Sequence, residues 1–382
     1  MRKWFVAIAL IAFFAPSASF SQAKNGKSGV YEQLNLFGEA FNRIRQDAVE
    51  PVADGKLVET AITGMLAGLD PHSSYLSETE YNSLKQPGGD EAASPGLVLT
   101  LDNGQLKVVS PRDGTPAAKA GVKPGDIIFT IDKEPTYDLT LSEAEQKLRG
   151  RAGTTVALTL RRGSGAPINL TLERASDKLE TIDSRLEKGP IGYIRIAGFD
   201  AATEAALTAA VQRIRERSGG KLIGVVLDLR NNPGGNFDAA VAVADAFIDK
   251  GDIAIVKGRK PDSIKHLSAK PGDLAKGLAI VALVNSGTAR EAELVAGALQ
   301  DNRRAVLLGT KTFGESSIES IIPIKGNGAI RLTTARFVTP SGRAIQGKGL
   351  DPDLTIAPAV GFGELFQLER RDRQIGAAAL AL

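Results

Sequence analysis

Apolar side chains recur at helical spacing in the N-terminal part of the chain. One such face is formed by Leu34, Phe37, Phe41 and Ile44. A second follows the turn at residues 50–55 and is formed by Leu57, Ala61, Met65 and Leu66. Residues three and four apart lie on the same side of a helix, so this pattern predicts a helical pair between residues 29 and 86. We assign residues 24–90 to a helical N-terminal segment.

Shorter apolar segments follow a linker of turn-forming residues at 86–95. Four of them alternate or run apolar over the length of a strand, namely residues 106–109, 127–131, 155–161 and 168–173. Residues 141–148 carry a helical pattern. The sequence therefore predicts a small β domain with helices at residues 91–178.

Strand and helix patterns alternate in the second half of the chain. The predicted strands are residues 192–196, 222–229, 281–284 and 305–308, and the predicted helices are residues 203–215, 237–249 and 292–300. This order is typical of an α/β domain, and the continuous apolar character of residues 222–229 indicates a parallel sheet. We assign residues 179–358 to this domain and residues 359–382 to a C-terminal tail with a helical segment at 364–373.

A tight turn joins the strand at 281–284 to the helix that follows it. Asn285, Ser286, Gly287 and Thr288 interrupt the apolar pattern before the helix begins. Such a junction presents one side chain and points backbone N–H groups at developing negative charge, as in a nucleophile elbow. The turn is therefore a candidate site for acyl chemistry.

Composition narrows the functional classes. With 382 residues the chain predicts two or three domains, and 43% hydrophobic and 24% charged residues are typical of a folded soluble protein. A net charge of +3 without a basic stripe gives no reason to expect nucleic acid as a partner. The chain has no cysteine, so it has no lipobox and no disulfides.

The N-terminus has the pattern of a secretory signal. Arg2 and Lys3 precede an apolar run at residues 4–14, and small residues at 21–23 suit a cleavage site. We expect residues 1–23 to be a signal peptide and the protein to be exported. The alternative is an uncleaved membrane anchor, although the apolar run is short for a spanning helix.

The stretch from Val281 to Glu319 resembles the carboxyl-terminal processing, or tail-specific, proteases. Their core reads roughly N-G-G-S-A-S-A-S-E-I-V-A-G-A-L-Q-D and then G-x-x-T-F-G-K-G-x-x-Q, and the matching residues here are Asn285, Gly287, Ala289, Glu293, 295–301, Gly309 and 312–314. Further similar segments are residues 70–76, 228–235, 328–346 and 349–353. The resemblance covers residues 29 to 355 and implies a crotonase-like α/β protease core, no cofactor and a bacterial periplasmic location.

The residues that carry the family's chemistry are substituted. The resemblance places the nucleophilic serine on Arg290, the general-base lysine on Glu315 and a glutamine on Glu319. A guanidinium stays protonated and cannot attack a carbonyl, and the base must be a neutral lysine. We expect Arg290 and Glu315 to form an ion pair; the alternative is two unrelated, solvated side chains.

The small β domain resembles a PDZ domain, on the pattern A-x-x-A-G-V-x-x-G-D-x-I at residues 117–128. PDZ domains add a peptide to a sheet edge and hold its terminal carboxylate on backbone N–H groups. The candidate loop here is Gly96, Leu97, Val98 and Leu99, with Val98 at the usual second glycine. Valine resists positive φ, so carboxylate affinity is open, and a purely structural or lid role is the alternative.

Two further features have both a functional and a structural interpretation. Gly234 and Gly235 match a loop that in the family helps to form the oxyanion hole; the alternative is a plain strand-to-helix turn. His72 is predicted to be a cap or packing residue, and we expect no metal site because no ligand cluster surrounds either histidine in the sequence.

The sequence supports two hypotheses for the function. The first is a non-catalytic, exported family member that binds polypeptide C-termini or unfolded segments, or that regulates an active relative. The second is an active serine endopeptidase with a displaced dyad, Ser286 and Lys311, whose separation of 25 residues equals that of positions 290 and 315. After signal removal we expect no stable membrane span. The sequence leaves the oligomeric state and the bound partners open.

Overall fold

The computed structural model describes residues 26–85, 93–176, 181–187 and 190–356. The chain divides into two compact units, residues 1–61 and 62–382. The predicted signal peptide, the C-terminal tail and its helical segment lie outside the described residues. None of the helices within the described part is both long and apolar enough to cross a membrane.

The N-terminal unit contains helix α1 (Gly26–Asp47) and the first half of α2 (Asp54–Ala67). Arg45 and Asp54 form an ion pair of 3.0 Å across the turn between them. The predicted apolar face of α1 is solvent-exposed at Leu34, Phe37 and Ile44. The two helices and the turn therefore follow the sequence pattern, without burial of that face.

The segment predicted as helical contains one strand that the pattern did not predict. β1 (Ser74–Leu76) precedes helix α3 (Glu78–Lys85) and pairs antiparallel with β16 (Ala329–Val338). This pairing joins residues about 250 positions apart, so no local periodicity could have indicated it.

The small β domain forms one antiparallel sheet with the strand order β2-β3-β4-β6-β7, and β5 also pairs with β4. Its elements are β2 (Leu97–Asp102), β3 (Gln105–Pro111), α4 (Pro116–Lys119), β4 (Ile127–Ile131), β5 (Glu134–Pro135), α5 (Leu141–Leu148), β6 (Thr155–Arg161) and β7 (Ile168–Glu173). A capping box of Thr140 and Glu143 begins α5. β2 lies at an edge of the sheet.

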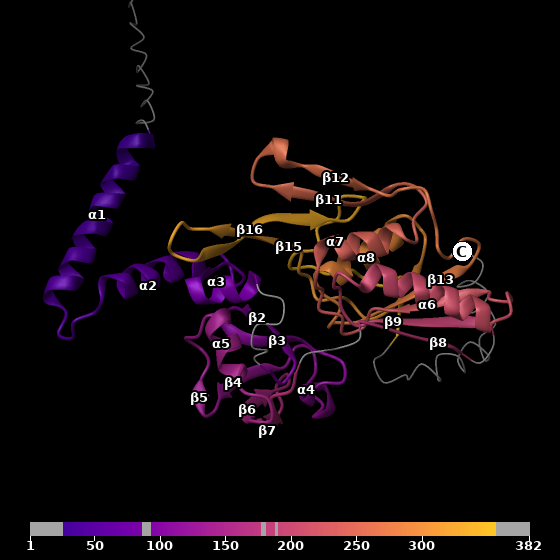
Figure 1. Cartoon of the computed structure of the whole chain (residues 1–382), viewed down its shortest axis with the longest axis horizontal. Coiled ribbons are helices and arrows are strands. Elements are labelled where there is room, and N and C mark those ends of the chain that lie inside the picture. Colours follow the sequence, from indigo (N-terminus) through magenta and orange to yellow (C-terminus); the bar gives the residue numbers. More distant parts are fainter. Residues whose placement is uncertain (1–25, 86–92, 177–180, 188–189, 357–382) are drawn as a thin grey trace, which may run out of the picture. The chain divides into compact units, whose positions relative to one another are not determined.

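The core sheet has the order β17-β14-β13-β10-β9-β8, parallel except for the β8–β9 pair. Its strands are β8 (Ile182–Leu186), β9 (Ile191–Ile196), β10 (Gly224–Asp228), β13 (Ala279–Val284), β14 (Val306–Gly309) and β17 (Leu354–Thr355). Helices α6 (Thr203–Arg217), α7 (Phe237–Asp245) and α8 (Glu291–Asp301) pack their apolar side chains against it (Figure 1).

Helix α7 ends four residues before the predicted end at Asp249. The backbone tightens at Phe247, whose N–H bonds to Ala244 O, and Ala246 O accepts a bond from Leu274 N. Phe247 and Ile248 are buried in the core. Their apolar character extended the helical pattern, but tertiary packing and not a further helical turn buries them.

A second, antiparallel sheet has the order β1-β16-β11-β12, with β15 also paired to β16. Its remaining elements are β11 (Asp252–Gly258), the short 3-10 helix η1 (Pro261–Ser263), β12 (Lys265–Ser268) and β15 (Ser317–Pro323). Glu319 lies within β15 and Glu315 lies two residues before that strand begins, so this sheet positions both residues.

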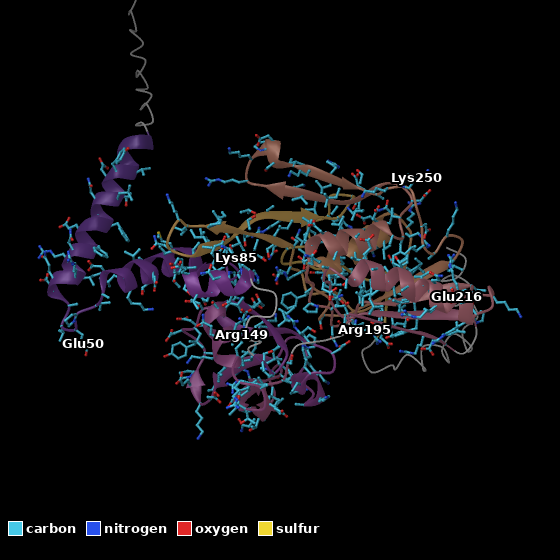
Figure 2. The ribbon with its side chains drawn as sticks, viewed as in Figure 1. Glu50, Lys85, Arg149, Arg195, Glu216 and Lys250 are labelled. Carbon is cyan, nitrogen blue, oxygen red and sulfur yellow. The ribbon has the colours of Figure 1, made fainter. Side chains whose placement is uncertain are left out.

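Direct contacts join the small β domain to the core sheet. Arg195 of β9, labelled in Figure 2, binds Asp113 through Nε at 2.8 Å and through Nη2 at 2.6 Å. Ser110 Oγ donates a hydrogen bond of 2.9 Å to the carbonyl oxygen of Asn231. The second contact reaches the loop that precedes Gly234, so the β domain touches the predicted oxyanion loop.

Candidate functional site

The turn between β13 and α8 places Arg290 where a nucleophile elbow presents its side chain. Arg290 has φ +53° and ψ −122°, a conformation that L-residues rarely adopt and that is held by its surroundings. On one side, Ala289 N donates to Asn232 O at 2.9 Å. On the other side, Arg290 N donates to Glu293 Oε2 at 3.2 Å. The strained turn of a nucleophile elbow is thus retained with arginine in it.

Glu293 fastens the second half of the motif to this helix. Its carboxylate accepts hydrogen bonds from the Thr312 hydroxyl, from Gly314 N at 2.9 Å and from Glu315 N at 2.8 Å. Burial raises its pKa to about 8, although these donors act in the opposite direction. The glutamate matched in the family pattern therefore sets the spatial relation of positions 290 and 315.

Arg290 and Glu315 approach each other, as predicted, but the shortest contact of Arg290 is with another carboxylate. Nη2 lies 2.5 Å from Glu319 Oε2, whereas Nε lies 3.6 Å from Glu315 Oε1. Ser317 Oγ links the acids with hydrogen bonds of 2.9 Å to Glu319 and 3.3 Å to Glu315. The three substituted positions thus form one ion network.

His72 joins this network, and the sequence did not reveal it. Its Nε2 lies 2.9 Å from Glu315 Oε1. Asp70 positions the histidine, since its carboxylate accepts hydrogen bonds from His72 N and Ser73 N, both at 2.9 Å, and from the Thr333 hydroxyl of β16 at 3.0 Å. His72 is therefore an ionic partner of Glu315, where the sequence suggested only a cap or packing residue.

His72 and Glu315 each shift the pKa of the other toward the charged form. Burial lowers the pKa of His72, but the hydrogen bond and charge of Glu315 outweigh it, and the net pKa lies above the usual 6.5. Burial raises the pKa of Glu315, but His72 and Arg290 bring it below its usual 4.5. The pair is therefore favoured as imidazolium and carboxylate.

The same side chains include a candidate set of metal ligands. His72, Glu315 and Glu319 offer ligand atoms that all lie within 4.8 Å of one another. Zinc accepts such ligands, so the premise that no cluster surrounds His72 does not hold in the fold. However, the Arg290 guanidinium already supplies a positive charge to both carboxylates.

The predicted oxyanion loop lies beside Arg290. Gly234 has φ +98° and a Cβ at this position would lie 2.8 Å from Arg290 Cβ, so a side chain would require the turn to move. Gly235 N donates a hydrogen bond of 2.9 Å to Glu291 Oε2. Glu291, the first residue of α8, was not predicted as a site residue, although the family pattern has alanine at this position.

The residues of the proposed displaced dyad have other surroundings. Ser286 is exposed, and Lys311 is exposed with its Nζ 3.1 Å from Asp351 Oδ1. Within the described residues Ser286 and Lys311 form no hydrogen bond with each other. The cavity beside Lys311 is also lined by Arg343, Ala344 and residues 347–351, and it does not include Ser286.

The candidate carboxylate loop of the small β domain begins at Gly96, with φ +82°. A Cβ there would lie 2.2 Å from Thr115 Cγ2, so glycine is required. Val98 lies in the edge strand β2 with negative φ, opposite Ser110. Valine therefore fits this backbone without strain. Leu97 and Leu99 flank it on the same strand.

Two cavities adjoin the ion network. One of about 310 Å³ is lined by Val98 and Leu99 of β2, by α5 at Leu141, Ser142 and Glu145, and by Pro71, His72, Ser74, Arg290, Glu319 and Arg331. The other, about 330 Å³, includes His72, Lys107, Phe313, Glu315 and Arg336. The space between β2 and α5 thus adjoins the cleft that contains Arg290.

Comparison with known families and proteins agrees with this arrangement. The family described as Peptidase family S41 matches residues 190–356, the PDZ domain family matches residues 107–162, and the family described as Activating protease CtpB N-terminal domain matches residues 8–80. The α/β core and the small β domain thus correspond to the expected protease and PDZ folds.

Individual relatives extend this likeness over most of the chain. The Carboxy-terminal-processing protease of Bartonella bacilliformis is 45% identical over 87% of this chain and 77% of its own length. The Carboxy-terminal processing protease CtpA of Bacillus subtilis is 33% identical over 91% of this chain and 74% of its own. The structure of the photosystem II D1 C-terminal processing protease superposes with a TM-score of 0.73 at 29% identity, covering 89% of this chain and 96% of that one. The chain therefore belongs to the carboxy-terminal processing protease family, Peptidase family S41, and carries that family's PDZ domain.

Proposed function

We propose that this chain is an exported, non-catalytic member of the family that binds polypeptide C-termini or unfolded segments without cleaving them. The observation that carries the proposal is the side chain at the nucleophile position. Arg290 cannot form an acyl intermediate, and its guanidinium is held in an ion network with Glu319 and Glu315. Export is supported by the signal-like pattern of residues 1–23.

The position of the general base supports the same conclusion. Glu315 is buried, and its pKa lies below the usual range, so it is ionised at neutral pH. A carboxylate bound to His72 at 2.9 Å is already paired. Moreover, it has no hydroxyl at position 290 from which to take a proton.

Peptide binding is supported by the PDZ domain. β2 is at the edge of its sheet, and β2 and α5 line a common cavity with residues that include Leu99 and Leu141. An extended peptide can add to such an edge through backbone hydrogen bonds, while its side chains enter the cavity between β2 and α5. Gly96 retains the positive φ with which the loop begins. A second mode of action, regulation of an active relative, would use the same groove.

The test is to incubate the purified protein with an unstructured polypeptide that ends in apolar residues, and to follow both binding and cleavage. We expect binding by fluorescence anisotropy, weaker binding when the terminal carboxylate is amidated, and no new fragments by mass spectrometry. Cleavage by the native chain would refute the proposal. In that case Ser286→Ala and Lys311→Ala would test the displaced dyad, which requires both residues for activity.

A further inference from the structure

The carboxylate of Glu291 lies on the backbone of the predicted oxyanion loop. Its Oε2 accepts the Gly235 N–H at 2.9 Å. A Cβ on Gly234 would lie 2.2 Å from the same oxygen and 3.2 Å from Glu291 N. The oxygen therefore occupies the space between the two glycines and the first turn of α8.

The groups around this oxygen are those that an acyl-transfer site directs at its oxyanion. A nucleophile elbow uses the backbone N–H of the residue after the nucleophile, together with an N–H from a neighbouring loop. Here the residue after position 290 is Glu291 itself. Burial raises the pKa of its carboxyl, while the charge of Arg290 and the backbone N–H groups of Gly235 and of Glu291 act in the opposite direction.

This carboxylate is enclosed and satisfied. The Glu291 side chain is 4% exposed, and its Oε2 lies 3.9 Å from Arg290 Nε. It also lies at the N-terminus of an 11-residue helix, where the helix dipole favours a negative charge. Moving this buried acid out of the site would break these contacts. A substrate carbonyl would therefore have to displace it.

We propose that the Gly234–Gly235 loop and the first turn of α8 form a carboxylate-binding site that the chain's own Glu291 occupies, closing the cleft to acyl chemistry independently of positions 290 and 315. This inference rests on the proposed non-catalytic function. It adds that restoring the family's serine and lysine alone does not restore cleavage.

The reaction that a restored site would perform defines the test. The hydroxyl of a serine introduced at position 290 attacks the peptide carbonyl and passes its proton to the amine of a lysine introduced at 315. The carbonyl oxygen takes up the electron pair and needs the two N–H groups. The C–N bond then breaks, the amine leaves with that proton, and water hydrolyses the resulting ester. With Glu291 in place, the oxyanion has no free donors.

The experiment compares three proteins that share the background Arg290→Ser, Glu315→Lys and Glu319→Gln. The last change removes a carboxylate that would hold the introduced lysine in its charged form. Position 291 is then Glu, Gln or Ala. We expect no cleavage of the unstructured polypeptide with Glu or Gln, because the Gln oxygen can still accept the Gly235 N–H. With Glu291→Ala we expect cleavage, at a rate at least about 10²–10³-fold above any residual rate of the other two proteins, the usual effect of an oxyanion-hole donor.

A second measurement reports on the site without activity. In the otherwise native chain, hydrogen exchange of the Gly235 amide should be at least ~10-fold faster with Glu291→Ala than with Glu291→Gln, because only the first removes the acceptor. Equal exchange in the two variants would overturn the proposal. Equal cleavage with Glu and with Ala would also overturn it, as would a folded Glu291→Ala background variant that does not cleave. Cleavage by the native chain is a separate result that refutes the proposed function instead.

Discussion

The core and the PDZ domain line one cavity from two sides, and their side chains there differ in kind. In the core, the backbone frame remains while charged side chains occupy the positions of nucleophile, base and oxyanion: Arg290, Glu315 and Glu291. In the groove, the edge strand β2 and helix α5 retain apolar lining residues such as Leu99 and Leu141. Catalysis depends on a few atoms, whereas peptide binding depends on a surface, so the proposed absence of catalysis is compatible with the proposed peptide binding.

The core side of this comparison predicts that Arg290 is structurally required. Arg290→Met removes the positive charge from between buried Glu315 and partly buried Glu319. We expect the free energy of unfolding to fall by about 1–3 kcal/mol, less than for a fully buried pair, because Arg290 and Glu319 are partly exposed and Glu315 keeps its contact with His72. Urea unfolding followed by circular dichroism measures this loss. Arg290→Lys is the matched control, because it keeps the charge and should lose less. An equal loss of stability in both variants would show that the positive charge of Arg290 does not stabilise the fold.

For the groove beside β2 we predict a loss of peptide binding without a loss of stability. Ser142 lines the cavity beside β2 and is only partly buried, so Ser142→Trp should fill the groove. We expect peptide affinity to fall at least ~10-fold, which corresponds to about 1.4 kcal/mol. Thr171→Trp is the control, since Thr171 is exposed on β7, at the opposite edge of the same sheet. Unchanged affinity with Ser142→Trp would place the peptide elsewhere.

The smallest effect concerns pH. The pKa of His72 is raised above 6.5, so its contribution to stability is present below pH 6.5 and is lost as the pH rises through the raised value. The pKa of Glu315 is lowered below 4.5, so its contribution is present above pH 4.5 and is lost as the pH falls. The native chain should therefore exceed Glu315→Gln in stability most clearly between about pH 4.5 and 6.5.

Titration of His72 by NMR provides the direct measurement for this pair. We expect a pKa above 6.5 in the native chain and a lower one in Glu315→Gln, in which the hydrogen-bonded charge is absent. The ring signals of His72 have to be assigned separately from those of His266, whose Nδ1 lies 2.7 Å from Asp252. A His72 pKa that does not respond to Glu315→Gln would contradict the pairing.

The fold was largely predictable because its signals are local. Apolar periodicity gave β4, β6, β7 and α5 with their observed bounds. Within the site, the match to the family pattern at positions 290 and 315 predicted the contact between these two residues. The strand β1 and the partnership of His72 with Glu315 were missed, because each joins residues more than 240 positions apart. Glu291 was missed for another reason: its partner Gly235 acts through a backbone N–H, which sequence patterns do not display.

The mutual pairing of these side chains also has an evolutionary consequence. Arg290 is bound to Glu319 and faces Glu315, Glu315 is bound to His72, and Glu291 is bound to Gly235. Replacing Arg290 alone by serine would remove the cation bound to Glu319, and replacing Glu315 alone by lysine would place a second cation beside Arg290. We therefore expect each of these single substitutions to lower stability without producing activity. If catalysis is absent, as proposed, its recovery would require several substitutions at the same time.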